Sequence, residues 1–201
     1  EYIDAAIENG AVAIISGKPY PGEFQKTWVR VADPRLAMGI ASANLEDNPS
    51  RKIPVVGVTG TNGKTTTTYL IHHLFKSVLH RAGLIGTIKY VIGDEVKDAP
   101  HTTPESPDVQ GLLREMVDSD CRGVAMEVSS HGIVQKRIAG VSFDVGVFTN
   151  LTQDHLDFHG GMQSYFEAKA ALFSGMESDA EKEGIAIINV DDSYGDRLKK
   201  M

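Results

Sequence analysis

Cysteine is nearly absent from the sequence: the only one among 201 residues is Cys121. A lone thiol cannot form an internal disulfide, so the sequence excludes a small disulfide-stabilised fold and favours a reducing compartment. We expect Cys121 to be a small, partly buried side chain just before a strand rather than a nucleophile.

Positive charge and long apolar runs are also scarce. The chain has 20 Lys and Arg against 27 Asp and Glu, a formal net charge of −7, and no basic stripe offsets that balance. Nucleic acid is therefore not expected as a general partner. No apolar run approaches the roughly 20 residues of a membrane span, and the first residues lack the basic and apolar regions of a signal peptide. We expect no membrane insertion and a cytoplasmic protein.

The two ends of the sequence resemble interrupted secondary structure. The first residue is Glu1 rather than methionine, and the residues after it have the pattern of a helix already under way. The last residues, up to Met201, fall within a predicted helix that begins near Ser193. We therefore expect a fragment of a longer protein, with room for one full domain and part of another.

The first 50 residues predict a small unit of helices and strands without recognisable chemistry. Gly10 is a good helix end, and Asp33 followed by Pro34 is a good helix start. The predicted elements are a helix over 2–9, a buried strand over 12–15, a strand over 28–31 and a helix from 34 to about 45. The polar segment 46–52 has the composition of a linker.

From Ile53 onward, strands alternate with helices, which predicts an α/β fold with a mainly parallel sheet flanked by helices. Strands are expected over 55–58, 124–128, 145–148 and 185–188, with a hairpin formed by 89–92 and the residues after Asp94. Helices are expected after residue 64, over 106–117 and over 162–174. The first of these is expected to end near Gly83 and to bury one apolar face: Leu70, Ile71, Leu74, Phe75, Val78 and Leu79.

The segment 55–68, VVGVTGTNGKTTTT, has the order strand, glycine-rich turn, helix. Gly60 and Gly63 let backbone N–H groups turn toward an anion, and the following helix presents its positive N-terminal end. Lys64 supplies a charge for the β- and γ-phosphates, and the Thr65 hydroxyl is suited to Mg²⁺. The segment therefore predicts a phosphate-binding loop for ATP, although the general pattern expects glycine where this chain has Val58.

Glu127 ends a predicted buried strand. A carboxylate at the carboxyl end of a parallel strand lies where ligands collect in open α/β sheets. In phosphate-loop proteins such an acid holds magnesium, directly or through water. A purely structural carboxylate is the alternative.

Two further segments carry residues of interest. His155 and His159, in TNLTQDHLDFHG, are spaced for metal binding or proton transfer, and a zinc site is equally compatible with that spacing. Lys169, in YFEAKAALF, has the pattern of a solvated lysine on an amphipathic helix. Its spacing from Leu172 and Phe173 nevertheless lets it lean toward the buried side.

Five motifs together resemble the Mur ligase family: GTNGKTTT, TTPES, EVSSHG, TNLTQDHLDFHG and YFEAKAALF occur in the family's order and spacing. They are most similar to the members that add the third amino acid to UDP-N-acetylmuramoyl-L-alanyl-D-glutamate. By this resemblance, residues 1–50 are the last part of a UDP-binding domain and residues 51–201 are the central ATP-binding domain. The family's third domain, which binds the incoming amino acid, would lie beyond Met201.

The resemblance implies ATP-dependent amide-bond synthesis in peptidoglycan assembly, through an acyl phosphate, by a bacterial cytoplasmic monomer. The added amino acid would be meso-diaminopimelate or L-lysine. Lys64, Lys169 and His155 would be catalytic, and Lys169 would react with CO₂ to form a carbamate. Mg²⁺ would be held by Thr65, Glu127, His155 and the carbamate. The implied ATP contacts are Gly60, Thr61, Asn62, Gly63, Lys64, Thr65, Thr66 and Asn150. The implied contacts to the muramoyl peptide are Thr102, Thr103, Ser129, Gln135 and Arg137.

Three alternatives remain open from the sequence. The closest is another ligase of the superfamily, either folylpolyglutamate synthase or a different Mur ligase. A second is a non-catalytic nucleotide-binding module that regulates a partner. A third is a zinc hydrolase built on the two histidines.

Overall fold

A computed structural model describes residues 2–23, 25–177, 179 and 182–201 of the protein. Among these residues, seven strands form one sheet in the order β6-β5-β4-β7-β3-β8-β9. The strands are β3 (Val55–Thr59), β4 (Gly83–Ile85), β5 (Lys89–Ile92), β6 (Glu95–Asp98), β7 (Val124–Glu127), β8 (Val145–Phe148) and β9 (Ile185–Ile188). β4, β7, β3, β8 and β9 are parallel, whereas β5 and β6 form an antiparallel hairpin. The predicted α/β fold is confirmed.

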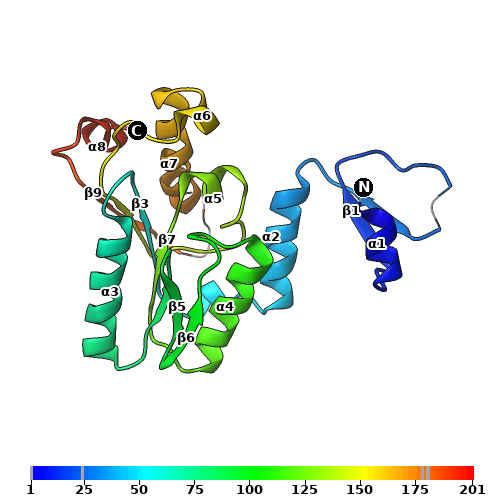
Figure 1. The fold of residues 1–201 in the computed structure, drawn as a ribbon, viewed down its shortest axis with the longest axis horizontal. Coiled ribbons are helices and arrows are strands. Elements are labelled where there is room, and N and C mark those ends of the chain that lie inside the picture. The colour runs from blue at the N-terminus through cyan, green and yellow to red at the C-terminus, as the bar shows by residue number, and fades with distance from the viewer. Residues whose placement is uncertain (1, 24, 178, 180–181) are drawn as a thin grey trace.

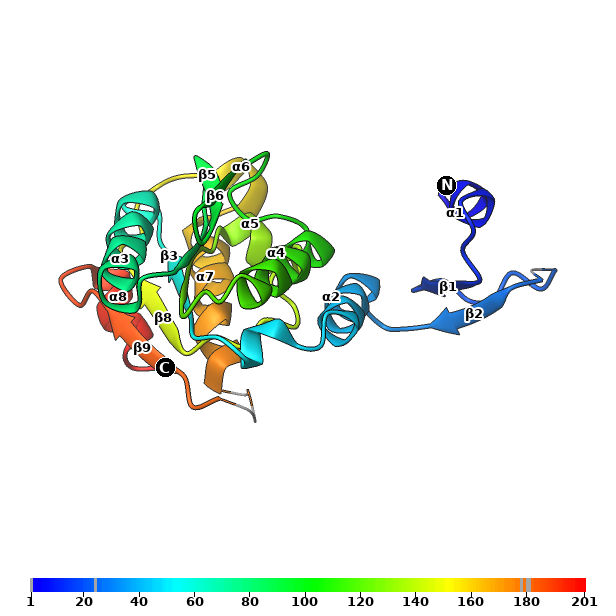
Figure 2. The same ribbon diagram turned by 90° about the horizontal axis from the view of Figure 1, so that it is seen from below.

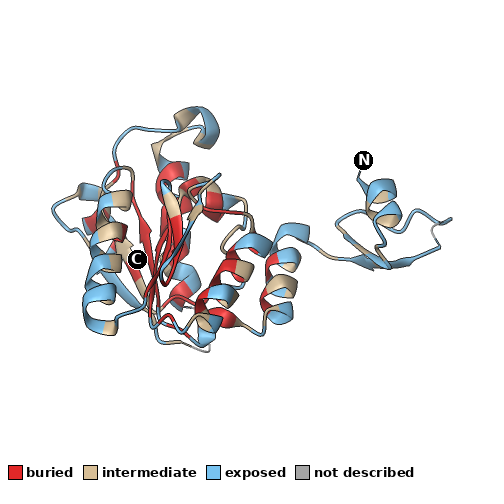
Figure 3. Cartoon of the chain, turned by 60° about the horizontal axis from the view of Figure 1, so that its bottom comes forward, coloured by how far each residue is buried: buried red, intermediate tan, exposed pale blue. Residues whose placement is uncertain are grey.

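Helices cover both faces of this sheet. They are α3 (Lys64–Leu79), α4 (Ser106–Asp118), α5 (Ser130–Val134), α6 (Leu156–His159), α7 (Met162–Glu177) and α8 (Ser193–Leu198). α3 lies on one side of the strands and α4 and α7 lie on the other (Figures 1 and 2). Because both faces are covered, the central strands β3, β4 and β7 are buried along their whole length (Figure 3).

The prediction for the buried face of α3 is wrong in part. Leu70, Leu74 and Val78 are 61%, 62% and 73% exposed. The helix turns a neighbouring row toward the sheet, in which Thr68 is buried and Phe75 lies against Gly123. The spacing of apolar residues therefore predicted the helix correctly, but it did not show which of two adjacent rows of side chains packs against the sheet. The helix also ends at Leu79, and Gly83 begins β4 instead of ending the helix.

The N-terminal unit lies to one side of the sheet (Figures 1 and 2). It consists of α1 (Ile3–Glu8) and a two-stranded parallel sheet of β1 (Ala13–Ser16) and β2 (Thr27–Arg30). The prediction that the first strand is buried is wrong, because residues of β1 alternate between exposed and half-buried. Val12, just before it, is 77% exposed.

The segment expected to be a linker is packed rather than free. It contains a short 3₁₀ turn, η1 (Pro49–Arg51), in which Pro49 and Ser50 are buried. The Ser50 hydroxyl accepts a hydrogen bond from the Ser142 N–H at 3.0 Å and donates to the Gly140 carbonyl at 3.5 Å. The preceding helix α2 (Pro34–Leu45) begins at its Asp33 cap as predicted, and it packs beside α4 (Figure 1). The domain boundary at residue 50 stays a prediction.

None of the described helices combines the length and the apolar character needed to cross a membrane.

Candidate functional site

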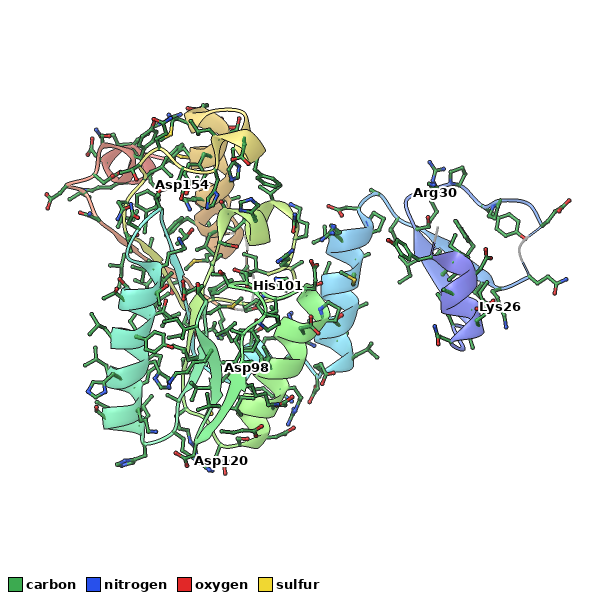
Figure 4. All side chains as sticks on the ribbon, in the orientation of Figure 1. Lys26, Arg30, Asp98, His101, Asp120 and Asp154 are labelled. Atoms are coloured by element: carbon green, nitrogen blue, oxygen red, sulfur yellow. The ribbon has the colours of Figure 1, made fainter. Side chains whose placement is uncertain are left out.

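Three adjacent parallel strands, β7, β3 and β8, end at the same edge of the sheet. The phosphate loop follows β3, Glu127 ends β7, and Thr149 and Asn150 follow β8. Asp154 marks this end of the molecule and Asp120 the opposite end (Figure 4). The carboxyl ends of parallel strands form the usual ligand-binding edge of such sheets.

Glycine is required at the first position of the phosphate loop because the backbone approaches a neighbouring loop. A Cβ atom on Gly60 would lie 1.9 Å from the Thr149 hydroxyl, and the φ angle of Gly60 is +149°. Gly63 also has a positive φ, +84°, and precedes the first turn of α3. The N-terminal N–H groups of this 16-residue helix therefore face the loop, as in other anion-binding sites.

Asn150 ties the phosphate loop to the segment after β8. Its side-chain oxygen accepts from the Asn62 N–H at 3.0 Å, and its side-chain nitrogen donates to the Asn62 carbonyl at 3.0 Å. The Thr61 N–H donates to the Asn150 carbonyl at 2.9 Å, and the Thr149 hydroxyl donates to the Asn62 carbonyl at 2.7 Å. Asn150 thus holds the loop in shape, and its expected contact to nucleotide stays a prediction.

Lys64 and Lys169 converge on the same carbonyl oxygen. The Lys64 ammonium donates to the carbonyls of Gly60 and Thr61 at 2.9 Å each. Lys169 donates to the Gly60 carbonyl at 2.8 Å and lies 4.5 Å from the centre of the Tyr165 ring. Two side chains more than 100 residues apart in the sequence are therefore neighbours beneath the loop.

Lys169 is buried, with 1% of its surface exposed. The interpretation as a solvated side chain, which the local pattern favoured, is wrong, because α7 packs Lys169 inward together with Tyr165, Phe166 and Leu172. Burial, with a smaller effect from the nearby charge of Lys64, lowers the pKa of Lys169 to about 7, although Asp154 opposes the shift. Desolvation also lowers the pKa of Lys64.

Glu127 is held by threonines from two sides. Its Oε2 accepts from the Thr65 hydroxyl at 2.9 Å and from the Thr87 hydroxyl at 3.1 Å, and its Oε1 accepts from the Thr87 N–H at 2.9 Å. The carboxylate is 1% exposed. Gly86 leaves room for it, since a Cβ atom there would lie 2.7 Å from Oε1. Thr87 was not predicted as a site residue, although it lies just after β4, at the same sheet edge.

Aromatic rings cluster above the loop. The centre of the His131 ring lies 4.9 Å from the centre of the His155 ring and 5.7 Å from that of the His159 ring. His159 Nε2 is 2.9 Å from the Ser130 hydroxyl oxygen. Burial first, and neighbouring histidines second, lower the pKa of both His131 and His159, which favours neutral imidazoles. His131 had not been singled out from the sequence, although it lies within the EVSSHG motif.

The histidines do not form a metal centre by themselves. Across the described ranges, no group of three or more His, Cys, Asp and Glu side chains is arranged to hold a metal ion. The zinc-hydrolase alternative therefore has no support in this part of the chain. Thr65 and Glu127 offer adjacent oxygen atoms, a donor set that suits a cation which keeps water and phosphate ligands, such as Mg²⁺.

A cleft of about 390 Å³ joins the phosphate loop to the residues expected to bind the peptide substrate. Its walls are Lys64, Thr65, Thr87, His101, Thr102, Thr103, Glu127, Ser129, His131, Gln135, Arg137 and His155. The other predicted site residues do not line this cleft: Gly60, Thr61, Asn62, Gly63, Thr66, Asn150 and Lys169. His101 is labelled in Figure 4, between Asp154 above it and Asp98 below it.

The wall opposite the loop is built from hydrogen-bonded side chains. The Thr103 hydroxyl donates to the Glu127 carbonyl at 3.0 Å and contacts the Ser129 hydroxyl at 3.0 Å. Ser129 caps α5 by accepting from the Gly132 N–H. Arg137 donates to the Thr103 carbonyl at 2.9 Å. A larger cavity, of about 700 Å³, lies elsewhere against β9 and α8 and contains none of the predicted site residues.

Comparison with known proteins gives consistent results. Residues 58–201 match the family model described as the Mur ligase middle domain. The chain is 52% identical over 204 residues to UDP-N-acetylmuramoyl-L-alanyl-D-glutamate–2,6-diaminopimelate ligase of Geobacter metallireducens, covering 98% of this chain and 39% of that protein. A solved structure of a ligase with the same name superposes with a TM-score of 0.83 at 34% identity, over 99% of this chain and 39% of that one.

A more distant solved structure shares the fold. Folylpolyglutamate synthase of Mycobacterium tuberculosis, complexed with ADP and AMPPCP, matches 81% of this chain and 43% of its own, with a TM-score of 0.59 at 18% identity. The chain spans about two fifths of the length of the curated relatives that it matches.

Proposed function

The chain belongs to the Mur ligase family, and we propose that it is the nucleotide-binding part of an ATP-dependent ligase acting on UDP-N-acetylmuramoyl-L-alanyl-D-glutamate. One observation carries the proposal. A phosphate loop with Lys64 and Thr65 and a wall with Gln135 and Arg137 face each other across one cleft. Such a cleft can bring a nucleotide phosphate against a substrate carboxylate. The high identity to curated diaminopimelate ligases supports this substrate class and favours 2,6-diaminopimelate over L-lysine as the added amino acid.

The proposed reaction transfers the γ-phosphoryl group of ATP to the substrate's free carboxylate. An amine then attacks the acyl phosphate, an amide bond forms, and phosphate leaves. Phosphoryl transfer depends mainly on in-line placement and on neutralising spread charge. Lys64 and the N-terminal end of α3 provide positive charge at the loop, and the burial of Lys64 strengthens that charge's effect.

Mg²⁺, when bound, neutralises phosphate charge, and the proposed protein donors are the Thr65 hydroxyl and the Glu127 carboxylate. Their oxygens are already 2.9 Å apart, and Thr87 fixes the orientation of the carboxylate. His155 lines the same cleft and is proposed as a further contact to the metal or its water.

CO₂ is proposed to modify Lys169. The amine nitrogen bonds to the carbon of CO₂ and loses one proton, so a cationic side chain becomes a carbamate anion. Only the neutral amine can react, and burial of Lys169, which brings its pKa to about 7, makes that form available near neutral pH. The resulting anion is proposed to contact a second Mg²⁺.

The carbamate level should depend on pH in a way that an ordinary lysine does not permit. An amine with a pKa of about 7 is mostly protonated below that pH and mostly neutral above it. We therefore expect carbamate formation on the full-length protein to increase as the pH rises through about 7. Carbon-13 NMR with labelled bicarbonate measures the adduct, and Lys169→Ala identifies its signal. An adduct that forms only above about pH 9, as expected for an unshifted lysine, would contradict the proposed state of Lys169.

The 201-residue chain alone is expected to make no tripeptide product, because it spans only about two fifths of the length of its relatives. A phosphate-release assay with ATP, the muramoyl dipeptide and diaminopimelate tests this, with the full-length ligase as the positive control. Full turnover by the 201-residue chain would refute the expectation. ATP binding without turnover by the full-length protein would instead favour the alternative of a non-catalytic nucleotide-binding module.

The bacterial cytoplasm is the proposed location, because the similar ligases come from bacteria such as Geobacter metallireducens and the chain has a single cysteine. A monomeric state stays a prediction.

A further inference from the structure

Glu105 occupies the capping position of α4 without capping the helix. Its φ and ψ angles are −63° and 155°, as for an N-cap, yet its side chain makes no hydrogen bond to the helix N–H groups. Asp33 and Asp192 occupy the same position in α2 and α8, and both accept hydrogen bonds from their helices. Glutamate is not among the residues that usually cap helices through their side chains, and the Glu105 carboxylate serves another contact.

That contact is with two arginines from separate segments. Glu105 Oε1 lies 2.9 Å from Arg137 Nη2, and Oε2 lies 3.2 Å from Arg35 Nη1. Arg35 belongs to α2, and it also donates to the Gln135 carbonyl at 3.2 Å. One carboxylate thus joins α2 and the start of α4 to the segment that follows α5.

The arrangement fixes the orientation of the Arg137 guanidinium. Nη2 is held by Glu105, and Nη1 donates to the Thr103 carbonyl at 2.9 Å. The Arg137 side chain is 18% exposed, so it is largely shielded from water. With both terminal nitrogens held, rotation of the guanidinium plane would break a charged hydrogen bond.

Two of the buried side-chain atoms that have no hydrogen-bond partner within the described part of the chain belong to residues that line the cleft. They are Arg137 Nε, a donor, and Gln135 Oε1, an acceptor, and both are buried. Buried polar atoms are normally paired, so Gln135 and Arg137 keep hydrogen-bonding capacity beside the cleft that the described protein atoms do not use.

Two prolines restrict the backbone on either side of Glu105. Pro104 precedes it and Pro107 lies in the first turn of α4, and each proline fixes its own φ angle. Without the negative charge of Glu105, the guanidinium groups of Arg35 and Arg137 would lose their shared partner and repel each other.

We propose that Glu105 is a positioning residue, which holds the Arg137 guanidinium in the orientation that binds an anionic group of the muramoyl-peptide substrate. Arg35 secures the other oxygen of the same carboxylate. This inference rests on the proposed function, because it takes Arg137 as a contact to that substrate. Glu105 itself acts through Arg137 and touches no reacting atom.

The first test uses Glu105→Gln in the full-length ligase. The glutamine amide has one acceptor oxygen and would present its NH₂ group to Arg35 or Arg137. Because Arg137 would then be held less firmly, KM for the muramoyl dipeptide should rise about tenfold. KM for ATP and kcat at saturating dipeptide should stay unchanged. The matched control is Glu115→Gln, which removes a carboxylate from the same helix, one that pairs with Lys97. It should change none of these values.

A double-mutant cycle in the dissociation constant of the dipeptide, measured by calorimetry, tests whether Glu105 acts through Arg137. If it does, Glu105→Gln should have no further effect in an Arg137→Met background. The proposal would be overturned if the effects of the two substitutions multiplied independently, or if Glu105→Gln left KM for the dipeptide unchanged. It would also be overturned if Glu105→Gln lowered kcat and raised KM for ATP to the same extent as it raised KM for the dipeptide. If Glu105→Gln does not fold, Arg35→Gln provides the second variant, and an unchanged KM there would also overturn it. A wild-type ligase that forms no tripeptide would instead refute the proposed function.

Discussion

Replacing Lys169 by alanine in the full-length ligase is expected to reduce kcat on the order of a thousandfold, the scale of losing a main electrostatic contact to the reacting group. Lys169 is buried under the Gly60 carbonyl and beside the Tyr165 ring, so water cannot take its place readily. A steady-state phosphate-release assay measures the loss. Because the proposed active group is a carbamate, a short carboxylic acid such as formate should restore part of the activity by filling the vacated space with an anion.

Two controls separate this chemical role from a general disturbance. Lys76→Ala removes an exposed lysine of α3 that pairs with Asp94, and it should leave kcat unchanged. Lys169→Met keeps the side-chain volume but removes the amine. Unchanged activity in Lys169→Ala would remove the carbamate from the mechanism, and a loss that formate cannot rescue in any degree would count against its anionic role.

Removing the Lys169 amine should abolish activity without lowering the stability of the fold. In CO₂-free protein the pKa of Lys169 falls from 10.5 when unfolded to about 7 when folded. Protonated Lys169 therefore destabilises the folded state below about pH 10.5. The cost increases as the pH falls from about 10.5 to about 7 and stays constant below that pH. Lys169→Met should accordingly melt no lower than the wild type at neutral pH, as measured by thermal unfolding, even though it is inactive.

Glu127→Gln is expected to lower kcat/KM by about a hundredfold or more and to raise the Mg²⁺ concentration needed for half-maximal rate. Glu127 accepts hydrogen bonds from the Thr65 hydroxyl and from both the N–H and the hydroxyl of Thr87. An amide of the same shape has one acceptor oxygen and turns an NH₂ group toward these donors. It also removes the negative charge proposed to hold Mg²⁺.

Titration of phosphate release with Mg²⁺ measures this change. Glu95→Gln, a substitution in the exposed hairpin strand β6, is the matched control and should leave the titration unaltered. A Glu127→Gln enzyme with the wild-type Mg²⁺ dependence would show that the carboxylate has only a structural role, the alternative that the sequence left open.

The prediction of the fold from the sequence was most accurate where the signals were local. Asp33 with Pro34 predicted the start of α2, the apolar run at 185–188 matched β9, and the residues around Gly93 formed the expected hairpin. Errors arose where an outcome depended on packing between distant segments. Leu70, Leu74 and Val78 lie one row away from the buried face of α3. The segment at 46–52 is docked because the Ser50 hydroxyl accepts a hydrogen bond from the Ser142 N–H and donates one to the Gly140 carbonyl.

The same division holds for the candidate site. The phosphate loop could be predicted because its function depends on a continuous segment, in which glycines, Lys64 and Thr65 must follow a strand and begin a helix. Glu127 was predictable from its place at a strand end. Thr87 and Glu105 were missed, because their importance comes from carboxylate contacts to residues that are distant in the sequence.

The alternation of strands and helices, the phosphate loop and the family motifs are all identifiable in the sequence, since each is a property of consecutive residues. The burial and the pKa of Lys169, in contrast, depend on the tertiary packing. Its helix pattern is compatible with a solvated side chain, but the packing of α7 against the loop buries the amine beside Lys64 and lowers its pKa to about 7. Desolvation and the approach of a second charge depend on which segments meet in space, and local spacing carries no information about that.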